Sequence, residues 1–527
     1  MKKLAILVMA AWAVHALAGA ALAVDFKIKG QWIMSFGYGA NGNFQGSYNG
    51  HETIGWGEGQ DNFEAVQRLR LQLDAVASEN LSGTVTFEIG ETYWGQQSTG
   101  GALGADGKIV EVKNAYLDWT LPETAVQVRM GLQNISTPSM ASGNAVLDAD
   151  VAGITVSAQV NDNVALTAFW ARPYNDNYLG YNEAYKGRPA GYHANFMDNL
   201  DVGGLMVPLT FDNISLTPWG MYGAMGPNTF RNGRSLDPLG NLNANTSEDS
   251  SYFMAGMFPA GGARHRDFSE AGSDRHVGSY ANMWWAGLTG QGTWDNFSAA
   301  FDFEYGAVTW DDDGRLNRSG WFAALLLEYS LDWGVPGLYG WYGSGDDGNP
   351  ANGSERLPAL DPNNANNFSY FAFDGAPYIE RYAVIGNNMA GTWGIGARLN
   401  NVSFVKDLSH IFRVNYIRGT NSPTMAKKMS LAGLWTNGTV LTPNLGSQGA
   451  ALGMPGMYLT SLDSALELGS TNSWQVYENM CINVEAGYVF MFLDTGKSVW
   501  GARHRNGESI PGTKDAWNVN ASFVYSF

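Results

Sequence analysis

Charged side chains recur at every second position in several apolar segments of this 527-residue chain. Arg68 and Arg70 are separated by one leucine, and Arg129 lies between Val128 and Met130. An extended strand points successive side chains to opposite faces, so this spacing collects charge on one face and apolar groups on the other. Neighbouring cations are costly unless they are wetted or paired. We therefore expect the charged face to contact water, where it could steer ions and polar solutes.

The same reading along the whole chain gives a set of charged residues on the polar faces of strands. The predicted bases are Lys27, Lys29, Arg68, Arg70, Arg129, Arg398 and Arg413, and the predicted acids are Asp74, Glu88, Asp118, Asp302, Glu304, Glu328, Glu467 and Glu485. Taken singly, most of these would be solvated wall residues with no special role. Arg68, Arg70 and Arg129 form the exception, because they should stand together on neighbouring hairpins.

The sequence contains no arrangement that is typical of catalysis, and we predict that the chain is not an enzyme. A phospholipase or a protease would need a histidine beside a nucleophile, or a pair of aspartates. Six histidines after the N-terminal segment instead fall in predicted loops and turns, at His51, His193, His265, His276, His410 and His504. The single cysteine, Cys481, excludes a disulfide framework and a cysteine-based metal site. Acidic loops at 311–314 and 346–348 could hold calcium, but their spacing is not that of an EF-hand, and we predict no cofactor.

Composition limits the class of protein further. Charged residues make up 15% of the chain, 66 residues are glycine and the formal net charge is −18. An acidic chain of this kind does not suit nucleic acid, which requires a basic face. Lys2 and Lys3, an apolar stretch over 4–17 and small residues at 21–23 predict a signal peptide, cleaved after residue 23. Residues 24–527 would then form one domain, without an apolar run long enough for a spanning helix.

Period-two alternation is the main structural signal in that domain. It begins at Phe26 and is found again in the last segment, which ends on Phe527. Between these two strands we expect eight hairpins, with tight turns at 78–80, 122–124, 161–163, 211–213, 294–296, 333–336, 406–409 and 477–480. The total is 18 strands, or 16 if one hairpin is misassigned.

Turns and longer connections alternate along the chain. The long connections are predicted at 39–63, 91–109, 134–152, 173–199, 225–281, 311–320, 344–390, 420–462 and 493–514. A soluble β-sandwich would have mostly short connections on both sides. Short periplasmic turns with long extracellular loops are typical of a transmembrane barrel. The prediction is therefore an all-β, closed antiparallel barrel in the bacterial outer membrane. Trp119, Trp170, Trp284, Trp321, Tyr416 and Tyr488 lie on its apolar phase, as membrane-girdle aromatics do.

Several segments carry a family resemblance. The final strand, with Phe523, Tyr525 and Phe527, resembles the C-terminal signature that the barrel assembly machinery recognises in Gram-negative outer-membrane proteins. Residues 67–71 (QRLRL), 113–119 (KNAYLDW), 128–131 (VRMG), 476–479 (VYEN) and 484–488 (VEAGY) resemble the homotrimeric outer-membrane porins of sulfate-reducing bacteria. The resemblance implies a homotrimer of water-filled diffusion channels, surrounded by outer-membrane lipid and lipopolysaccharide.

In general porins the third loop folds into the barrel and narrows it, and by resemblance the third long connection, 134–152, should do the same. Asp148 and Asp150 would then face the wall of Arg68, Arg70 and Arg129 and create a transverse field. This segment lacks the Pro-Glu-Phe-Gly-Gly sequence of better-known porins. An alternative is that it caps the mouth or contacts a neighbouring subunit.

The function expected from these features is passive diffusion of small hydrophilic solutes and ions through a general porin. Counting Asp148 and Asp150, ten acids against seven bases on the predicted lumen favour a mild preference for cations. A basic cluster at the narrowest point would instead favour small anions such as sulfate. A substrate-specific channel remains an alternative, although the polar phase offers few aromatic residues, Tyr116 among them. A barrel-based outer-membrane enzyme is the less favoured alternative.

Overall fold

The computed structural model describes residues 24–40, 62–104, 106–107, 109–174, 200–225, 280–310, 317–349, 352–360, 368, 389–426, 459–496 and 513–527. In the first half of the chain the strands are β1 Asp25–Ala40, β2 Asn62–Ser78, β3 Leu81–Tyr93, β4 Val110–Thr120, β5 Val126–Ser136, β6 Asp148–Asn161, β7 Val164–Tyr174, β8 Leu200–Met206, β9 Leu209–Thr210 and β10 Ile214–Met225. The second half contributes β11 Ala281–Trp294, β12 Phe297–Trp310, β13 Arg318–Tyr329, β14 Val335–Gly343, β15 Thr392–Val405, β16 Leu408–Gly419, β17 Ser464–Tyr477, β18 Met480–Phe492 and β19 Ala516–Ser526.

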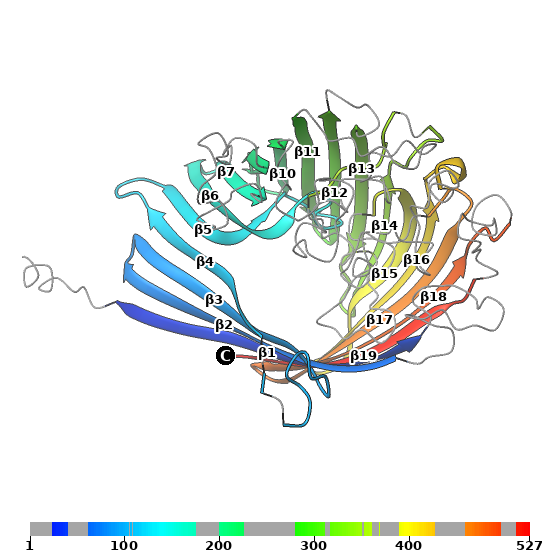
Figure 1. Cartoon of the computed structure of the whole chain (residues 1–527), viewed down its shortest axis with the longest axis horizontal. Coiled ribbons are helices and arrows are strands. Elements are labelled where there is room, and N and C mark those ends of the chain that lie inside the picture. The colour runs from blue at the N-terminus through cyan, green and yellow to red at the C-terminus, as the bar shows by residue number, and fades with distance from the viewer. Residues whose placement is uncertain are drawn as a thin grey trace, which may run out of the picture.

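The strands form one closed antiparallel sheet. Each strand pairs with its neighbours in sequence, and β1 pairs with both β2 and β19. Figure 1 shows the blue first strand beside the red last strand, where the barrel closes. Closure leaves no sheet edge unpaired, which is the condition for a sheet in hydrocarbon.

One wall strand is broken, which explains why 19 segments make an 18-stranded barrel. β8 and β9 both pair with β7 and β10, and only Val207 and Pro208 separate them. Proline cannot donate to a strand ladder, so the ladder stops there and resumes at Leu209. The structure confirms the predicted fold: 18 strands, with all eight predicted hairpin turns at one end.

The outer face of the barrel is apolar, as the alternation predicted. Leu325, Leu338 and Ile395 expose 48%, 63% and 60% of their surface on the outward phase. The six predicted girdle aromatics also point outward, with exposures of 36% to 44%. Outward aromatics gather at both ends of the strands: Trp119, Trp294, Trp333, Trp474 and Tyr477 near the short turns, and Trp170, Tyr222, Trp284, Trp321, Tyr342, Tyr416 and Tyr488 near the long connections.

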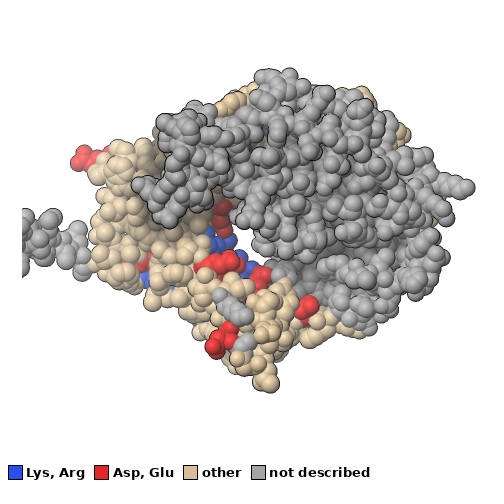
Figure 2. All heavy atoms as spheres, in the orientation of Figure 1, with Lys and Arg blue, Asp and Glu red and all other residues tan. Residues whose placement is uncertain are grey.

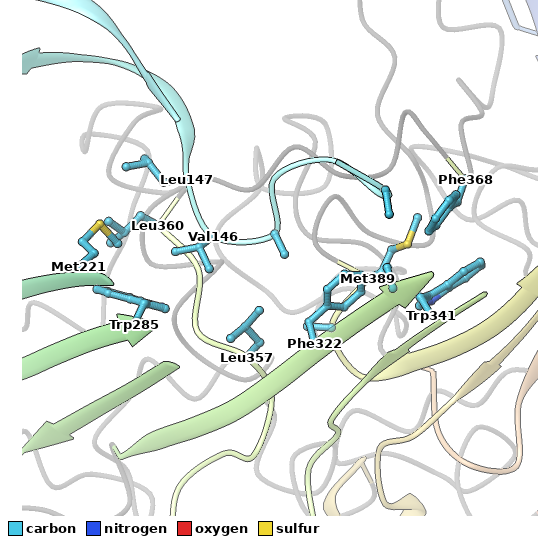
Figure 3. Close-up of a cluster of buried hydrophobic side chains, with 14 of the residues drawn as sticks. Val146, Leu147, Met221, Trp285, Phe322, Trp341, Leu357, Leu360, Phe368 and Met389 are labelled. Atoms are coloured by element: carbon cyan, nitrogen blue, oxygen red, sulfur yellow. The ribbon is translucent and has the colours of Figure 1, made fainter. Parts of the chain in front are cut away.

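The buried apolar core lies inside the barrel, along β10 to β14. Inward side chains of these strands, including Met221, Trp285 and Phe322, pack against residues of two long connections. Figure 3 shows Val146 and Leu147 from one connection and Leu357 and Leu360 from the other, in one cluster with Met221, Trp285 and Phe322. Among the described residues, no helix is long and apolar enough to cross a membrane.

Candidate channel and its constriction

The inner wall formed by β2 and β3 carries a group of paired charges, which we call the Arg70 cluster. Arg70 donates from Nε to Oε2 of Glu88 at 2.5 Å. Arg68, two residues along the same strand, donates from Nη1 to Oε1 of Glu91 at 3.2 Å and has its Nε 4.0 Å from Glu88. The two arginines point inward because Leu69 and Leu71 occupy the outward phase of β2. Each arginine of this cluster therefore has an acid on the adjacent strand.

A second group, the Arg129 cluster, lies on β4 and β5. Arg129 makes two hydrogen bonds with Asp118, at 2.7 and 3.0 Å, in the fork geometry that guanidinium and carboxylate share. Its guanidinium carbon lies 4.1 Å from the ring centroid of Tyr116, within cation–π range. Arg129 and Asp118 expose 43% and 37% of their side chains, so water reaches this pair from inside the barrel.

The remaining predicted bases are divided between two sectors of the wall. Lys27 and Lys29 are exposed on β1, and Lys29 lies 3.8 Å from Asp74 of β2. Arg398 lies on β15 and bonds Glu328 at 2.9 Å, while Arg413 is its register partner on β16. Arg398 exposes only 11% of its side chain. The accessible charge is thus concentrated on β1 to β5, and Figure 2 shows blue and red side chains together in the hollow of the barrel.

The connection between β5 and β6 folds into the barrel and is fastened to the opposite wall. Its anchor is Asp302 of β12, whose carboxylate accepts backbone hydrogen bonds from Met140, Ala141 and Ser142 at 2.8 to 3.0 Å. The hydroxyls of Ser139, Ser142 and Thr289 also bond this carboxylate. Asp302 is only 2% exposed. A buried carboxylate needs such donors, so the loop satisfies the acid and the acid holds the loop.

A second connection lies beside the first. Leu360 donates its N–H to the carbonyl of Val146 at 2.8 Å, which joins the two segments directly. The indole of Trp285 donates to the carbonyl of Pro358 at 2.8 Å. Gly320 of β13 lets the second connection approach the wall closely, because a Cβ there would lie 2.3 Å from the backbone of Arg356. Burial raises the pKa of the Glu355 carboxyl, which accepts from the N–H of Asp347 in this segment.

The sequence pattern did not indicate this second inserted segment, 352–360, or the apolar lining beneath it. It also predicted few inward aromatics, whereas Trp219, Phe322, Tyr339 and Trp341 point inward and are at most 6% exposed. A signal was present: β11 to β14 carry pairs such as Trp284–Trp285 and Trp321–Phe322, which place an aromatic on both faces. A strand that is apolar on both faces is buried on both faces, so these pairs indicate that other parts of the chain pack against the inner side of β11 to β14.

Glu304 is the other inward acid of β12 and has a different environment from Asp302. It is 1% exposed, and neither carboxylate oxygen has a hydrogen-bond partner within the described part of the chain. Glu467 and Glu485 are also buried on the inner wall, at 2% and 7% exposure. These acids do not line an accessible surface with the Arg70 and Arg129 clusters.

Asp148 and Asp150 require a correction, because they do not face the arginine wall. Both belong to the start of β6, where Val151 and Gly153 take the inward phase and Ile154, 40% exposed, takes the outward phase. On this outward side Asp150 bonds Lys113 and Asn114, and Asp148 bonds Asn134. The β5–β6 ladder extends through Asp148, and strand alternation fixes the direction of both side chains. The inserted part of the connection is therefore 137–147.

The C-terminal residues lie at the seam of the barrel. Phe523, Tyr525 and Phe527 are 37%, 41% and 49% exposed on the outer face. Phe527 exchanges two backbone hydrogen bonds with Gly30 of β1, at 2.8 and 3.0 Å. The residues of the predicted assembly signal are thus the ones that complete the β1–β19 pairing.

The described residues contain no group of three or more histidine, cysteine or acidic side chains that could hold a metal ion. In the acidic loop 346–348, Asp346 bonds Ser354 and Asp347 accepts from Asn352. The other acidic loop, at 311–314, lies outside the described residues. So do all the predicted loop histidines except His410, which lies on β16 next to Asn472.

Comparison with known proteins gives distant structural matches only. No protein-family model matches the chain. No curated protein matches it either, so the resemblance to the porins of sulfate-reducing bacteria has no further support. Among solved structures, OpdQ of Pseudomonas aeruginosa is similar with 11% identity and a TM-score of 0.47, covering 95% of this chain and 98% of its own.

Two further structures are similar at the same level. OccAB3 of Acinetobacter baumannii has 8% identity and a TM-score of 0.46, covering 95% of this chain and 100% of its own. The outer membrane protein OprD of Pseudomonas aeruginosa has 10% identity and a TM-score of 0.44, covering 96% and 95%. At these values the likeness carries no substrate or activity over to this chain.

Proposed function

We propose that this protein is a bacterial outer-membrane channel through which small hydrophilic solutes and ions diffuse passively. The observation that carries the proposal is the contrast between the two faces of one closed sheet. The outer face exposes leucine, isoleucine and aromatic rings, whereas the inner face of β1 to β5 exposes Lys29, Arg70 and Arg129 by 63%, 35% and 43% of their side chains. Charged side chains on the inner face of a transmembrane barrel require water in its lumen.

The narrow part of the channel is formed, in this proposal, by the connection 137–147 on one side and the Arg70 and Arg129 clusters on the other. The connection is held by Asp302 and by the second segment through Leu360. The apolar core under both segments fills the β10–β14 side of the lumen. Solutes would therefore pass along the β1–β5 side, where the accessible charges are.

Selectivity should be weak, because bases and acids stand on the same wall. Arg70 with Glu88, Arg129 with Asp118 and Lys29 with Asp74 form local pairs. The field of such a pair falls off faster with distance than the field of a lone charge. The expected transverse field between loop acids and an arginine wall is replaced by short-range dipoles along one wall. Such a surface suits zwitterionic or neutral polar solutes as well as ions.

A general porin is the form of the channel that we favour, with no enzymatic activity. The exported chain would be a homotrimer, as the resemblance of its motifs implies, with outer-membrane lipid and lipopolysaccharide around it. An anion-selective or substrate-specific channel is the second candidate. It is favoured by one observation: the pore wall is asymmetric, with charge on β1 to β5 and apolar packing on β10 to β14.

The test is single-channel recording in planar bilayers with a salt gradient, using detergent-purified folded protein. We expect large ohmic openings and a small reversal potential for the wild type. In Arg68→Ala with Arg70→Ala, Glu88 and Glu91 lose their partners, so the reversal potential should move toward cation preference. In Glu88→Gln with Glu91→Gln it should move the opposite way.

Arg418→Ala is the matched control, because Arg418 lies on the outward phase of β16 and bonds the carbonyl of Ser461. Its reversal potential should equal that of the wild type. Equal shifts of the reversal potential in all three variants would show that the Arg70 cluster does not lie in the ion path. Current that one sugar or anion blocks at low concentration would favour the substrate-specific candidate instead.

A further inference from the structure

The outer wall of the barrel is hollowed by a groove near the short turns of β12 to β16. It has a volume of about 720 Å³ and is lined by Phe297, Leu327, Glu328, Tyr329, Pro336, Gly337, Leu338, Ala397, Arg398, Leu399, Phe412, Arg413 and Val414. Its apolar members lie on the outward phase, since Leu338, Phe412 and Tyr329 are 63%, 45% and 47% exposed. The groove therefore opens to the surroundings of the barrel and not to the lumen.

Strand register explains why the wall is hollow here. Pro336 of β14 stands opposite Leu399 of β15, and in the next outward row Leu338 stands between Leu327 of β13 and Ala397 of β15. Proline and alanine are short, whereas the flanking Phe297 and Phe412 are long. Short side chains between the two phenylalanines make a narrow apolar groove along the outer surface. A barrel wall is convex, so the wall of a second copy would bridge such a groove without filling it.

A column of rings connects the groove to the β15–β16 turn. Phe412 stacks on His410, with centroids 6.1 Å apart, and Phe404 lies 6.4 Å from His410. The turn itself is amphipathic: Phe404 and Val405 are 79% and 60% exposed, and the side chain of Lys406 is 91% exposed. The ammonium of Lys406 is 4.0 Å from Asp407, which is itself half exposed, so this pairing is weak.

We propose that this groove binds one acyl chain of a phospholipid of the periplasmic leaflet, and that Lys406 contacts its phosphate. Apolar side chains of the outward phase line most of the groove, and Lys406 stands at the short-turn end, where headgroups would lie. Lysine snorkels in this way between an apolar surface and a polar boundary. The inference rests on the proposed membrane location of the barrel, and it adds a specific lipid site to an otherwise uniform outer face.

Native mass spectrometry of the purified barrel tests the site, with dioleoyl phosphatidylethanolamine as the probe and dioleoylglycerol as the analogue without phosphate. We expect one retained phospholipid per wild-type chain. Ala397→Phe fills the groove and should lower retention about tenfold, since several buried methylene groups are displaced. Ala158→Phe, on the outward phase of β6, is the control and should retain lipid as the wild type does.

Two other variants separate the chain from the headgroup. Leu338→Ala deepens the groove and should leave retention equal or higher, whereas Lys406→Gln should abolish the preference for the phospholipid over dioleoylglycerol. Equal retention in Ala397→Phe and Ala158→Phe, or retained detergent in place of phospholipid, would overturn the proposal. Channel conductance of the same samples is measured in parallel. A wild type that binds lipid but gives no openings would contradict the proposed function and leave the lipid site standing.

Discussion

Asp302 shows how one side chain can fix the position of a whole connection. Its two carboxylate oxygens accept from three backbone N–H groups and three hydroxyls, five of these donors lying in the connection 137–147. A turn of backbone N–H groups around a carboxylate is a common anion-binding arrangement. Here the anion belongs to the far wall of the same barrel, so the contact holds the connection across the lumen.

Replacing Asp302 with alanine should release the connection and raise single-channel conductance. Hydrogen bonds to a charged group contribute about 1.5–3 kcal/mol each, so the loss of all of them is large compared with thermal energy. Asp302→Asn should give an intermediate conductance, because an amide oxygen still accepts but carries no charge. Asp212→Asn, at the β9–β10 turn, serves as the control. Conductance of Asp302→Ala equal to that of this control would show that the anchor does not set the pore width.

For single residues, the sequence predicted the strand face that a side chain occupies better than the residue that it contacts. Alternation placed Arg68, Arg70, Arg129 and Asp302 on the inward phase, as the structure has them. It could not tell that Glu91 lies beside Arg68, because the strand pairing there shifts at a bulge between residues 67 and 69. The direction of Asp150 failed for a related reason. The prediction placed residues 134–152 in a connection, whereas β5 runs on to Ser136 and β6 already begins at Asp148.

Two connections and one sector of wall act together at the scale of elements. The segments 137–147 and 352–360 meet at the bond from Leu360 to Val146 and share a core with β10 to β14. Tight turns were predictable from local residues, such as Asn161-Asp162-Asn163. The inward folding of the second segment was not, because it depends on contacts with strands more than 60 residues away, such as the bond from Trp285 to Pro358.

Shortening the β5–β6 connection should open the channel further than the release of its anchor. Thr137 donates to the carbonyl of Leu147 at 2.8 Å, so residues 138–146 can be replaced by Asn-Gly, which suits a two-residue hairpin. The expected conductance exceeds that of Asp302→Ala, because the chain is removed and not only loosened. The segment 352–360 would also lose its contact with Val146. Unchanged conductance in a folded barrel would mean that the connection lies outside the solute path.

The whole molecule depends on one seam, where the last strand meets the first. The sequence predicted this closure well, since both terminal segments alternate and an even strand count returns both ends to the same side. The register of this pairing could not be predicted from the sequence, because a period-two pattern fits any shift of two residues equally well. The structure sets it through ten pairs, from Gln31 with Ser526 to Ala40 with Trp517. Phe527 then lies on Gly30, beyond the end of β19.

A double-mutant cycle at Gly30 and Phe527 tests whether this contact sets closure. A Cβ on Gly30 would lie 2.5 Å from the ring of Phe527, so Gly30→Ala must displace the ring. We expect Gly30→Ala and Phe527→Ala each to lower the free energy of unfolding measured in lipid vesicles, and the pair to cost less than their sum. Contacting residues couple by about 0.5–3 kcal/mol.

Gly220→Ala is the matched control for this cycle, because a Cβ on that outward strand glycine would meet its nearest neighbour at 3.7 Å. It should change neither the free energy of unfolding nor the heat-dependent shift of the folded barrel on a gel. Additive effects at Gly30 and Phe527 would mean that the terminal ring is independent of the seam. A coupling of the expected size would instead show that the ring of Phe527 and Gly30 stabilise the β1–β19 pairing together.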